Sequence, residues 1–268
     1  MATSDASGLQ ISPSRQELKV EPGGSATGSI VVANLTKQDL KVTLFFREFS
    51  VTNTNYDYSF QDSHYDWIHI SEPEVTLKPQ QSKTLTYTLD PVKDASPGGY
   101  YFTVFASSNI RSGEVNSTLQ AADLLYVTVN GALDKSTRLD TIDLPTILVS
   151  PDITYAFAMT NTGNVYYTIY SIAKLSNIFD TTEGDTAAHV VLPQKQRVLT
   201  GSLPAPSYPG IYTATIGYRT DSGNQATFTK HVIYIPLWGM VIVIGITIVL
   251  SRLGMIAFRR WRRRRTMR

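Results

Sequence analysis

Thr84-Leu85-Thr86-Tyr87-Thr88-Leu89 is the most regular two-residue alternation in the chain: three large apolar side chains are separated by threonines. In a β-strand this period places the Leu and Tyr side chains on one face and the threonines on the other. Threonine favours strands because its branched side chain fits a pleated surface. One apolar and one polar face predict a strand of an antiparallel sheet that covers a core on one side.

Similar short strands are predicted on both sides of residues 84–89, wherever runs rich in Val, Ile, Thr, Tyr and Phe lie between turn residues. They are Ser29–Val32, Leu40–Phe46, Tyr101–Ala106, Leu124–Val129, Ile153–Met159, Val165–Ile172, Arg197–Leu203, Tyr212–Tyr218 and Ala226–Ile235. Nothing in residues 1–231 sustains a helical period. The pattern predicts an all-β ectodomain of two tandem Ig-like antiparallel β-sandwiches, followed by one C-terminal transmembrane α-helix.

The two halves share turn motifs in the same order. Val75–Gln80 corresponds to Val190–Gln194, Asn34-Leu35-Thr36 to Asn161-Thr162-Gly163, and Pro97–Tyr100 to Pro209–Tyr212. Proline fixes φ and glycine allows positive φ where a strand reverses, so convergent turn chemistry is an alternative to common ancestry. We interpret the motifs as a duplicated fold with a boundary near Asn130-Gly131-Ala132. The predicted parts are a lead (1–8), two sandwiches (9–130 and 133–231), a transmembrane helix (232–258) and a basic tail (259–268).

One long apolar segment lies near the C-terminus. From Val232 to Ser251 the chain has 20 residues without a charge. As a helix that rises about 1.5 Å per residue, this segment would span about 30 Å, the thickness of a hydrocarbon core. Arg252 can reach the headgroups from the helix end, so the predicted span extends over residues 232–258. A buried core helix is the weaker alternative, because such a helix rarely lacks a polar face. The predicted partner of this segment is the lipid bilayer.

The charges predict the orientation of this helix. Basic residues collect at its C-terminal end: Arg252, Arg259, Arg260, Arg262, Arg263, Arg264 and Arg265. The positive-inside rule then places the tail in the cytoplasm and residues 1–231 outside the cell. We expect a single-pass type I protein of the cell membrane. The lead has no apolar core, so a signal peptide is expected to have been removed. A tail-anchored protein is the alternative, but it would carry the arginines across the bilayer.

Composition disfavours several classes of protein. Residues 1–234 carry 16 basic and 22 acidic groups, and this net charge of −6 offers no basic face to nucleic acid. The chain has no cysteine, which excludes disulfides, cysteine-ligated zinc and a cysteine nucleophile. The sequence also lacks the Gly-x-Ser-x-Gly, dinucleotide, P-loop and His-Glu-x-x-His motifs. We therefore expect no enzyme and no cofactor.

Two histidines lie near aspartates in the first half of the chain. His64 and His69 are five residues apart, close to Asp57, Asp62 and Asp66. Zinc or a hard cation could use such ligands, but the spacing fits no defined metal loop. We expect exposed loop residues and no metal.

Thr52–Ile70 combines aromatic rings with short polar side chains and is the main insertion of the first half relative to the second. Flat rings beside amide and carboxylate acceptors suit a sugar, and Tyr and Trp also dominate protein interfaces. The candidate residues for binding a glycan or a protein are Asn53, Asn55, Tyr56, Asp57, Tyr58, Tyr65, Asp66 and Trp67. In the alternative interpretation, Tyr56, Tyr58 and Phe60 occupy one face of a strand and close the sandwich.

The first 106 residues resemble the WxL-interacting protein family of Gram-positive surface proteins. The motifs that carry this resemblance are Ile11-Ser12-Pro13, Glu21-Pro22-Gly23-Gly24, Asn34, Thr52–Tyr58, Val75–Pro79 and Pro97–Tyr100. The resemblance implies a peptidoglycan-binding first Ig-like domain and a second Ig-like domain that binds a host or partner, ahead of a transmembrane helix and a basic tail. The second half matches the family less closely.

These observations predict a membrane-anchored, non-catalytic cell-surface protein whose outer Ig-like domain contacts cell-wall peptidoglycan or another surface protein. The alternative is a structural or chaperone-like surface module that binds a protein partner by adding a strand to a sheet edge. Binding of that kind would survive aromatic-to-alanine changes between residues 56 and 67 and fail when an edge strand is blocked. A glycan hydrolase is a less favoured third possibility.

Overall fold

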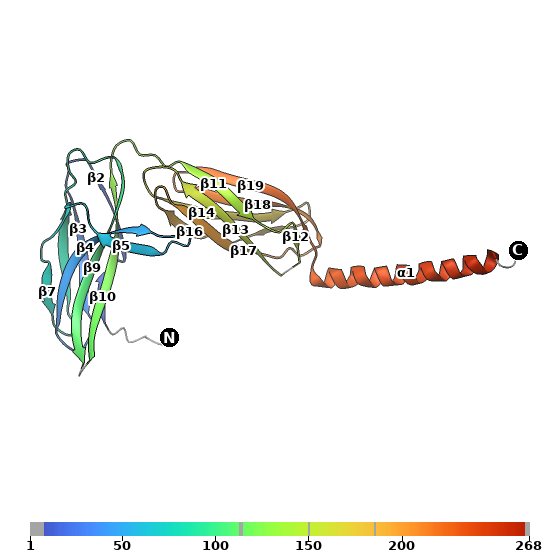
Figure 1. Cartoon of the computed structure of the whole chain (residues 1–268), viewed down its shortest axis with the longest axis horizontal. Helices are drawn as coiled ribbons and strands as arrows, with labels where there is room; N and C mark the ends of the chain where they lie inside the picture. Colours follow the sequence, from blue (N-terminus) through green and yellow to red (C-terminus); the bar gives the residue numbers. More distant parts are fainter. Residues whose placement is uncertain (1–7, 113–114, 150, 185, 266–268) are drawn as a thin grey trace. The chain divides into compact units, whose positions relative to one another are not determined.

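The computed structural model describes residues 8–112, 115–149, 151–184 and 186–265, and Figure 1 shows their strands and helix. The chain divides into two compact units. The first contains residues 1–138 with 160–167 and 191–197, and the second contains residues 139–159, 168–190 and 198–268. The predicted domain boundaries at residues 130 and 133 stay a prediction.

The first β-sandwich is built from ten strands. They are β1 (Leu9–Ser12), β2 (Arg15–Val20), β3 (Ala26–Asn34), β4 (Leu40–Val51), β5 (Tyr58–Asp62), β6 (Ile68–Ile70), β7 (Glu74–Leu77), β8 (Ser82–Leu89), β9 (Gly98–Ser112) and β10 (Val115–Val129). One sheet has the order β1-β3-β8-β6, and the other has the order β2-β10-β9-β4-β5 with β7 also paired to β4. The apolar residues of β8, namely Leu85, Tyr87 and Leu89, are at most 1% exposed and belong to the core between the sheets.

The second sandwich repeats this plan with nine strands. They are β11 (Thr137–Asp143), β12 (Ile147–Leu148), β13 (Asp152–Asn161), β14 (Tyr167–Ser176), β15 (Thr181–Glu183), β16 (Ala188–Val191), β17 (Gln196–Pro204), β18 (Gly210–Thr220) and β19 (Gln225–Tyr234). Its sheets are β11-β13-β17 and β12-β19-β18-β14-β15, with β16 paired to β14. The two tandem β-sandwiches predicted from the sequence are confirmed, and every predicted strand overlaps an observed one.

A buried asparagine closes the corresponding turn in each half. The Asn34 amide donates to the carbonyl oxygens of Gln38 (2.8 Å), Leu77 (2.9 Å) and Lys78 (3.0 Å). Asn161 donates in the same way to the carbonyls of Val165 and Val191, both at 3.0 Å. Further along the chain, Gln80 and Gln194 both adopt positive φ, at 58° and 57°. The motifs that suggested a duplication therefore form matching turns.

The C-terminal helix α1 runs from Leu237 to Arg265. Its residues Leu237–Ile256 have a mean hydropathy of 2.2, and this segment is long and apolar enough to cross a membrane. The helix begins five residues after the predicted start of the span at Val232. The reason is that Val232 and Tyr234 are 0% and 5% exposed and end strand β19 in the sandwich.

Candidate functional site: the free edge of strand β10

The N-terminal segment is divided between the two sheets of the first sandwich. β1 pairs antiparallel with β3 in one sheet, and the chain then crosses to the other. There β2 pairs parallel with β10, from Arg15 opposite Leu124 to Val20 opposite Val129. The Leu124 N–H donates to the Ser14 carbonyl at 3.1 Å and fixes the start of this pairing. β2 therefore covers only the C-terminal part of β10.

The preceding part of β10 has a free edge. β9 pairs with β10 along its whole length on one side, without a break in register. Backbone N–H groups of a strand alternate between its two sides, and those of Leu124 and Asn130 point to β2. The N–H and C=O groups of residues 116, 118, 120 and 122 consequently point to the same side. No strand among the described residues pairs with them there.

The β9–β10 hairpin also extends beyond its other neighbour. β4 pairs with β9 only between Glu48, opposite Phe102, and Thr43, opposite Ser107. The ends of both hairpin strands, green in Figure 1, thus continue past the strands that flank them. At this end of the hairpin, β9 and β10 pair only with each other among the described strands.

The composition of this free edge is unusual for an exposed strand. Proteins normally protect sheet edges with Lys, Pro, bulges or very short strands, because an open row of N–H and C=O groups pairs with other chains. Val115–Ala122 contains neither a charged residue nor a proline. β19, which pairs with its own parallel edge strand as β10 does, carries Lys230 and His231 on the stretch before that pairing. The β10 edge has no such protection.

Apolar side chains on the inner face of the sandwich are partly exposed beside this edge. Odd-numbered side chains of β10 point inward, and Leu125 and Val127 are fully buried in the core. Further toward the free end, Leu119 and Ala121 are only partly buried against the core, as is Ile110 of β9. Strand β1 of the opposite sheet lies within 8 Å of β10, measured between Cα atoms. The free edge therefore borders apolar side chains that are still partly exposed.

Asp123 is a carboxylate on this inner face. It is fully buried, and its Oδ2 accepts a hydrogen bond from the Gln16 side-chain amide. The Tyr87 hydroxyl donates to Gln16 Oε1 at 3.2 Å, so the three side chains link β10, β2 and β8. The other carboxylate oxygen of Asp123, Oδ1, has no hydrogen-bond partner in the part of the chain that the structure describes. Burial raises the pKa of Asp123 from 3.8 to about 6, against the lowering effect of Gln16.

Glycine makes room for the tyrosine of this group. A Cβ atom at Gly28 would lie 2.2 Å from the hydroxyl oxygen of Tyr87, which stands opposite it on β8. The ring can lie over β3 and bring its hydroxyl to Gln16 only because residue 28 has no side chain.

The sequence-predicted binding residues at 53–57 form a tight turn. Asn53 Oδ1 accepts hydrogen bonds from the backbone N–H groups of Asn55 (3.0 Å) and Asp57 (3.2 Å). The Asn53 amide donates to Asp57 Oδ2 at 2.7 Å. These polar groups shape the turn between β4 and β5, as Asx side chains commonly do.

Tyr56 points inward from this turn at a φ of 70° and is 7% exposed. Its hydroxyl accepts from the Leu192 N–H at 3.0 Å, and the Arg197 guanidinium lies 4.1 Å from its ring centroid, all within the first unit. Burial raises the pKa of Tyr56 to about 12. Tyr58, the next aromatic residue, lies on β5 and is 45% exposed.

Tyr65, Asp66 and Trp67 come together at a cavity of about 470 Å³ in the first unit. The ring centroids of Tyr65 and Trp67 are 4.5 Å apart, and Tyr100 lies 5.3 Å from Tyr65. Trp67 is 4% exposed and belongs to the core, so the rings pack on one another. The candidate residues thus fall into a turn, a strand and this cavity. Their part in binding a partner stays a prediction.

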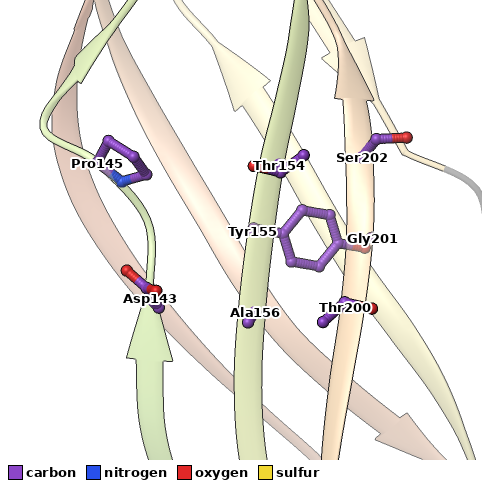
Figure 2. A pocket seen from close by; sticks show the side chains of 8 residues that line it. All are labelled: Asp143, Pro145, Thr154, Tyr155, Ala156, Thr200, Gly201 and Ser202. Carbon is purple, nitrogen blue, oxygen red and sulfur yellow. The ribbon is translucent and has the colours of Figure 1, made fainter.

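A second cavity, of about 530 Å³, lies in the second unit (Figure 2). It is lined by Asp143, Pro145, Thr154, Tyr155, Ala156, Thr200, Gly201 and Ser202. Figure 2 shows the Tyr155 ring beside Gly201, where a Cβ atom would lie 2.4 Å from the tyrosine hydroxyl oxygen. The titratable side chains of this lining are Asp143 and Tyr155.

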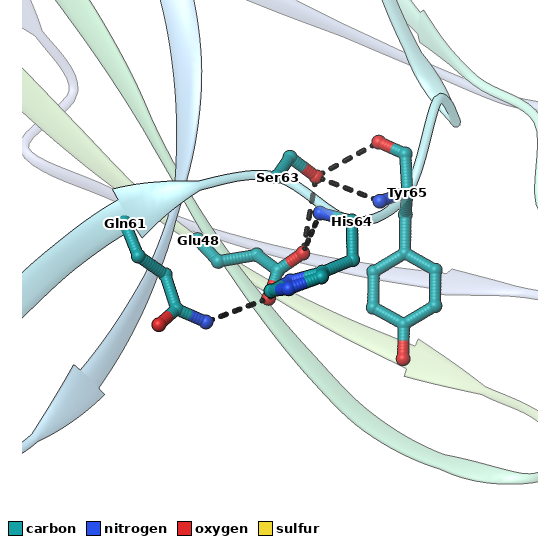
Figure 3. Close-up of polar contacts among 5 residues, drawn as sticks. All are labelled: Glu48, Gln61, Ser63, His64 and Tyr65. Carbon is teal, nitrogen blue, oxygen red and sulfur yellow. Dashed lines mark hydrogen bonds and ion pairs between the residues drawn. The ribbon is translucent and has the colours of Figure 1, made fainter.

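Glu48 forms hydrogen bonds with His64, the first of the two histidines near the aspartates (Figure 3). Glu48 Oε1 accepts from the His64 backbone N–H at 2.5 Å, and its Oε2 lies 3.3 Å from the ring Nδ1. Burial acts to raise the pKa of Glu48, but hydrogen bonds from His64, Gln61 and Ser63 outweigh it and lower the pKa. His69 lies on strand β6 instead. Among the described residues, no group of three or more His, Asp or Glu could hold a metal ion.

Comparison with known proteins gives structural similarities only. No family model and no curated protein matches the chain. Similar solved structures include the class 5 fimbriae chaperone CfaA, with 15% identity and a TM-score of 0.46, covering 86% of this chain and 100% of that one. Another is the CsuC–CsuE chaperone–tip subunit complex of Acinetobacter baumannii, with 11% identity and a TM-score of 0.44, covering 86% and 100%. A PapD-like domain of human CEP192 shows 15% identity and a TM-score of 0.35, covering 49% and 92%. These similarities are too low for a function to be transferred.

The comparisons correct the resemblance to the WxL-interacting family. No family model supports it, and the similar solved structures are fimbrial chaperones and a PapD-like domain. The short turn motifs that carried the resemblance are ones that many Ig-like sandwiches need at a strand reversal. The cell-wall and peptidoglycan binding that it implied is withdrawn with it.

The buried carboxylate predicts an unusual dependence of stability on pH. Because the folded-state pKa of Asp123 lies above 3.8, protonation favours the folded state. Its stabilising contribution is fully present below pH 3.8 and is lost as the pH rises through about 6. At pH 7.5 the Asp123→Asn variant should therefore be more stable than the parent by about 1–3 kcal/mol. This gain should shrink as the pH falls through 6.

Urea unfolding of the full chain in mild detergent, followed by tryptophan fluorescence between pH 4 and 8, measures this difference. Asp39→Asn removes an exposed carboxylate and is the matched control, with no expected pH-dependent gain. Parallel pH profiles for the parent and Asp123→Asn would contradict the assignment of a raised pKa to this group.

Proposed function

We propose that the first sandwich binds a partner protein by adding an extended segment of it, as a strand, to the free edge of β10. The observation that carries this proposal is the unprotected row of backbone groups on residues 116–122. Strand addition takes its affinity from main-chain hydrogen bonds and its specificity from alternate side chains. The reaction is association alone and requires no catalytic group.

Both components of such binding are present at this edge. The N–H and C=O groups of residues 116, 118, 120 and 122 point outward. Each hydrogen bond that they form with an added strand contributes about 0.5–1.5 kcal/mol net. Every second side chain of the added strand would point into the sandwich, against the partly buried Leu119 and Ile110. Covering these side chains adds a hydrophobic contribution that an isolated edge cannot supply.

A proline on the outward-facing side of the edge tests the proposal. Gln120→Pro removes an N–H that does not pair with β9 and places a ring where the added strand would lie, so the hairpin is retained while binding is lost. The probe is a fluorescein-labelled nine-residue peptide in which Val alternates with Thr, titrated into the detergent-solubilised full chain. We expect the dissociation constant to rise at least tenfold in Gln120→Pro.

Two variants serve as controls. Gln120→Ala keeps the backbone N–H and should bind as the parent does. Tyr58→Ala should also bind as the parent does, because β5 lies at the opposite edge of the sheet. Equal affinity of the parent and Gln120→Pro, with both folded by circular dichroism, would rule out this edge as the binding site.

We also propose that α1 crosses a membrane, with residues 1–231 on the outer side. The support is its 20-residue apolar segment, together with the arginines from Arg252 to the C-terminus and no acidic residue in that stretch. Strand capture would then take place outside the cell, on a protein that is held at the membrane surface.

The absence of cysteine makes this topology straightforward to measure. A single cysteine is introduced at Ser222, in the exposed turn before β19, or at Thr266 near the C-terminus. In intact cells, a membrane-impermeant maleimide should label Ser222→Cys, while Thr266→Cys should react only after permeabilisation. The reverse pattern would place the sandwiches in the cytoplasm, and immediate labelling of both would exclude a spanning helix.

A further inference from the structure

Asp123 lies at the junction between the covered and the free part of β10. β2 begins to pair at the next residue, Leu124, whose N–H already donates to the Ser14 carbonyl. The chain that crosses from β1 to β2 at residues 13 and 14 therefore occupies the position next to Asp123 along the outer edge of β10. A strand added to the free edge ends its pairing near Ala121 and Ala122.

The geometry of a sheet then limits which side chain of the added strand can reach Asp123. The residue beside Ala121 points its side chain to the same inner face, since neighbours across a ladder share a face. Asp123 is its diagonal neighbour, about 7–8 Å away, which is within reach of a long side chain only. A short polar residue at that position cannot contact the carboxylate.

The surroundings of Asp123 leave its charge without a counter-ion. The side chains that face it are Gln16 from β2, which donates to Oδ2, and Tyr87 from β8, whose hydroxyl is directed to Gln16. Arg15, which precedes Gln16 on β2, stacks instead on the Tyr126 ring, with its guanidinium carbon 4.3 Å from the ring centroid. No basic group of the described residues neutralises this carboxylate.

An uncompensated buried carboxylate has a strong preference for one kind of neighbour. An ionised carboxyl group only accepts hydrogen bonds, and Oδ1 of Asp123 is buried with none. A cation that donates to Oδ1 satisfies the oxygen and neutralises the charge in one step, whereas an apolar or acidic neighbour leaves both costs in place.

We propose that the strand bound at the β10 edge carries a lysine or arginine at the position beside Ala121, and that its cationic head group pairs with Asp123 Oδ1. This inference rests on the proposed strand addition and names the chemistry of the partner segment. It assigns specificity to Asp123, while affinity comes mainly from the backbone of residues 116–122.

Peptides that differ at one position test the pairing. The nine-residue Val/Thr peptide is compared with versions in which each Val in turn is replaced by Lys, by norleucine or by Glu. One position should show Lys binding at least tenfold tighter than norleucine at pH 7.5, with Glu weaker than both. Asp123→Asn should abolish this preference, and the matched control Asp39→Asn should keep it. The preference should also weaken below pH 6, as Asp123 becomes protonated.

The outcomes separate this inference from the proposed function. If the peptides bind and Gln120→Pro prevents binding, but Lys and norleucine are equivalent at every position, the assignment of Asp123 is overturned and strand addition stands. If no peptide binds the folded parent, strand addition itself is contradicted. The peptide substitutions give this answer in the unmodified protein, so the result does not depend on the folding of Asp123→Asn.

Discussion

The first sandwich is organised by the division of one N-terminal segment between two sheets. β1 completes the edge of one sheet and β2 completes the edge of the other, with the chain crossing between them at residues 13 and 14. Because β1 occupies the residues before the crossing, the parallel pairing of β2 cannot begin before Arg15. Residues 115–123 of β10 are consequently left without a partner on one side. The open edge follows from how the chain is shared, rather than from a short or frayed strand.

Several energetically unfavourable features lie close together beside the free part of β10. Leu119 and Ile110 are only partly buried, and Asp123 is buried with an unpaired oxygen and a raised pKa. The centre of the first core is fully enclosed, as Val32, Val104 and Val127 show. A bound strand would relieve each of these costs: its backbone would pair the edge, its apolar side chains would cover Leu119 and Ile110, and a cation would neutralise Asp123. The second sandwich carries Lys230 on the corresponding edge.

The fold was predictable because local patterns determined it. The alternation at residues 84–89 indicates a strand with one buried face. In the turn motifs, Asn34 and Asn161 each accept a local hydrogen bond from the backbone N–H two residues later, although their amides also reach carbonyls far along the chain, Leu77 and Val191. The positions of the longer strands therefore followed from the sequence, and so did their arrangement in two sandwiches, whereas β1, β2 and β11 were not predicted.

The site was not predictable in the same way. Strands β9 and β10 continue over Ser107–Ser112 and Val115–Asp123, which lack alternation and are rich in Ser and Asn. These two segments are strands because they pair with each other in the hairpin. The β-propensity of their residues does not indicate this pairing. Asp123 has its partner Gln16 at a separation of 107 residues. Conversely, Tyr56 and Trp67 have the composition of a binding surface, but tertiary packing buries them.

Residue-resolved amide hydrogen exchange, measured by NMR on the micelle-bound full chain without any ligand, tests the open edge most directly. The account predicts an alternation: the amides of Thr118 and Gln120 exchange rapidly, while those of Leu119 and Ala121 are protected by β9. The alternation should end where β2 begins, so that Tyr126 and Thr128 are protected as well. Uniform protection from residue 116 to residue 129 would show that the edge is already paired, and it would contradict the account.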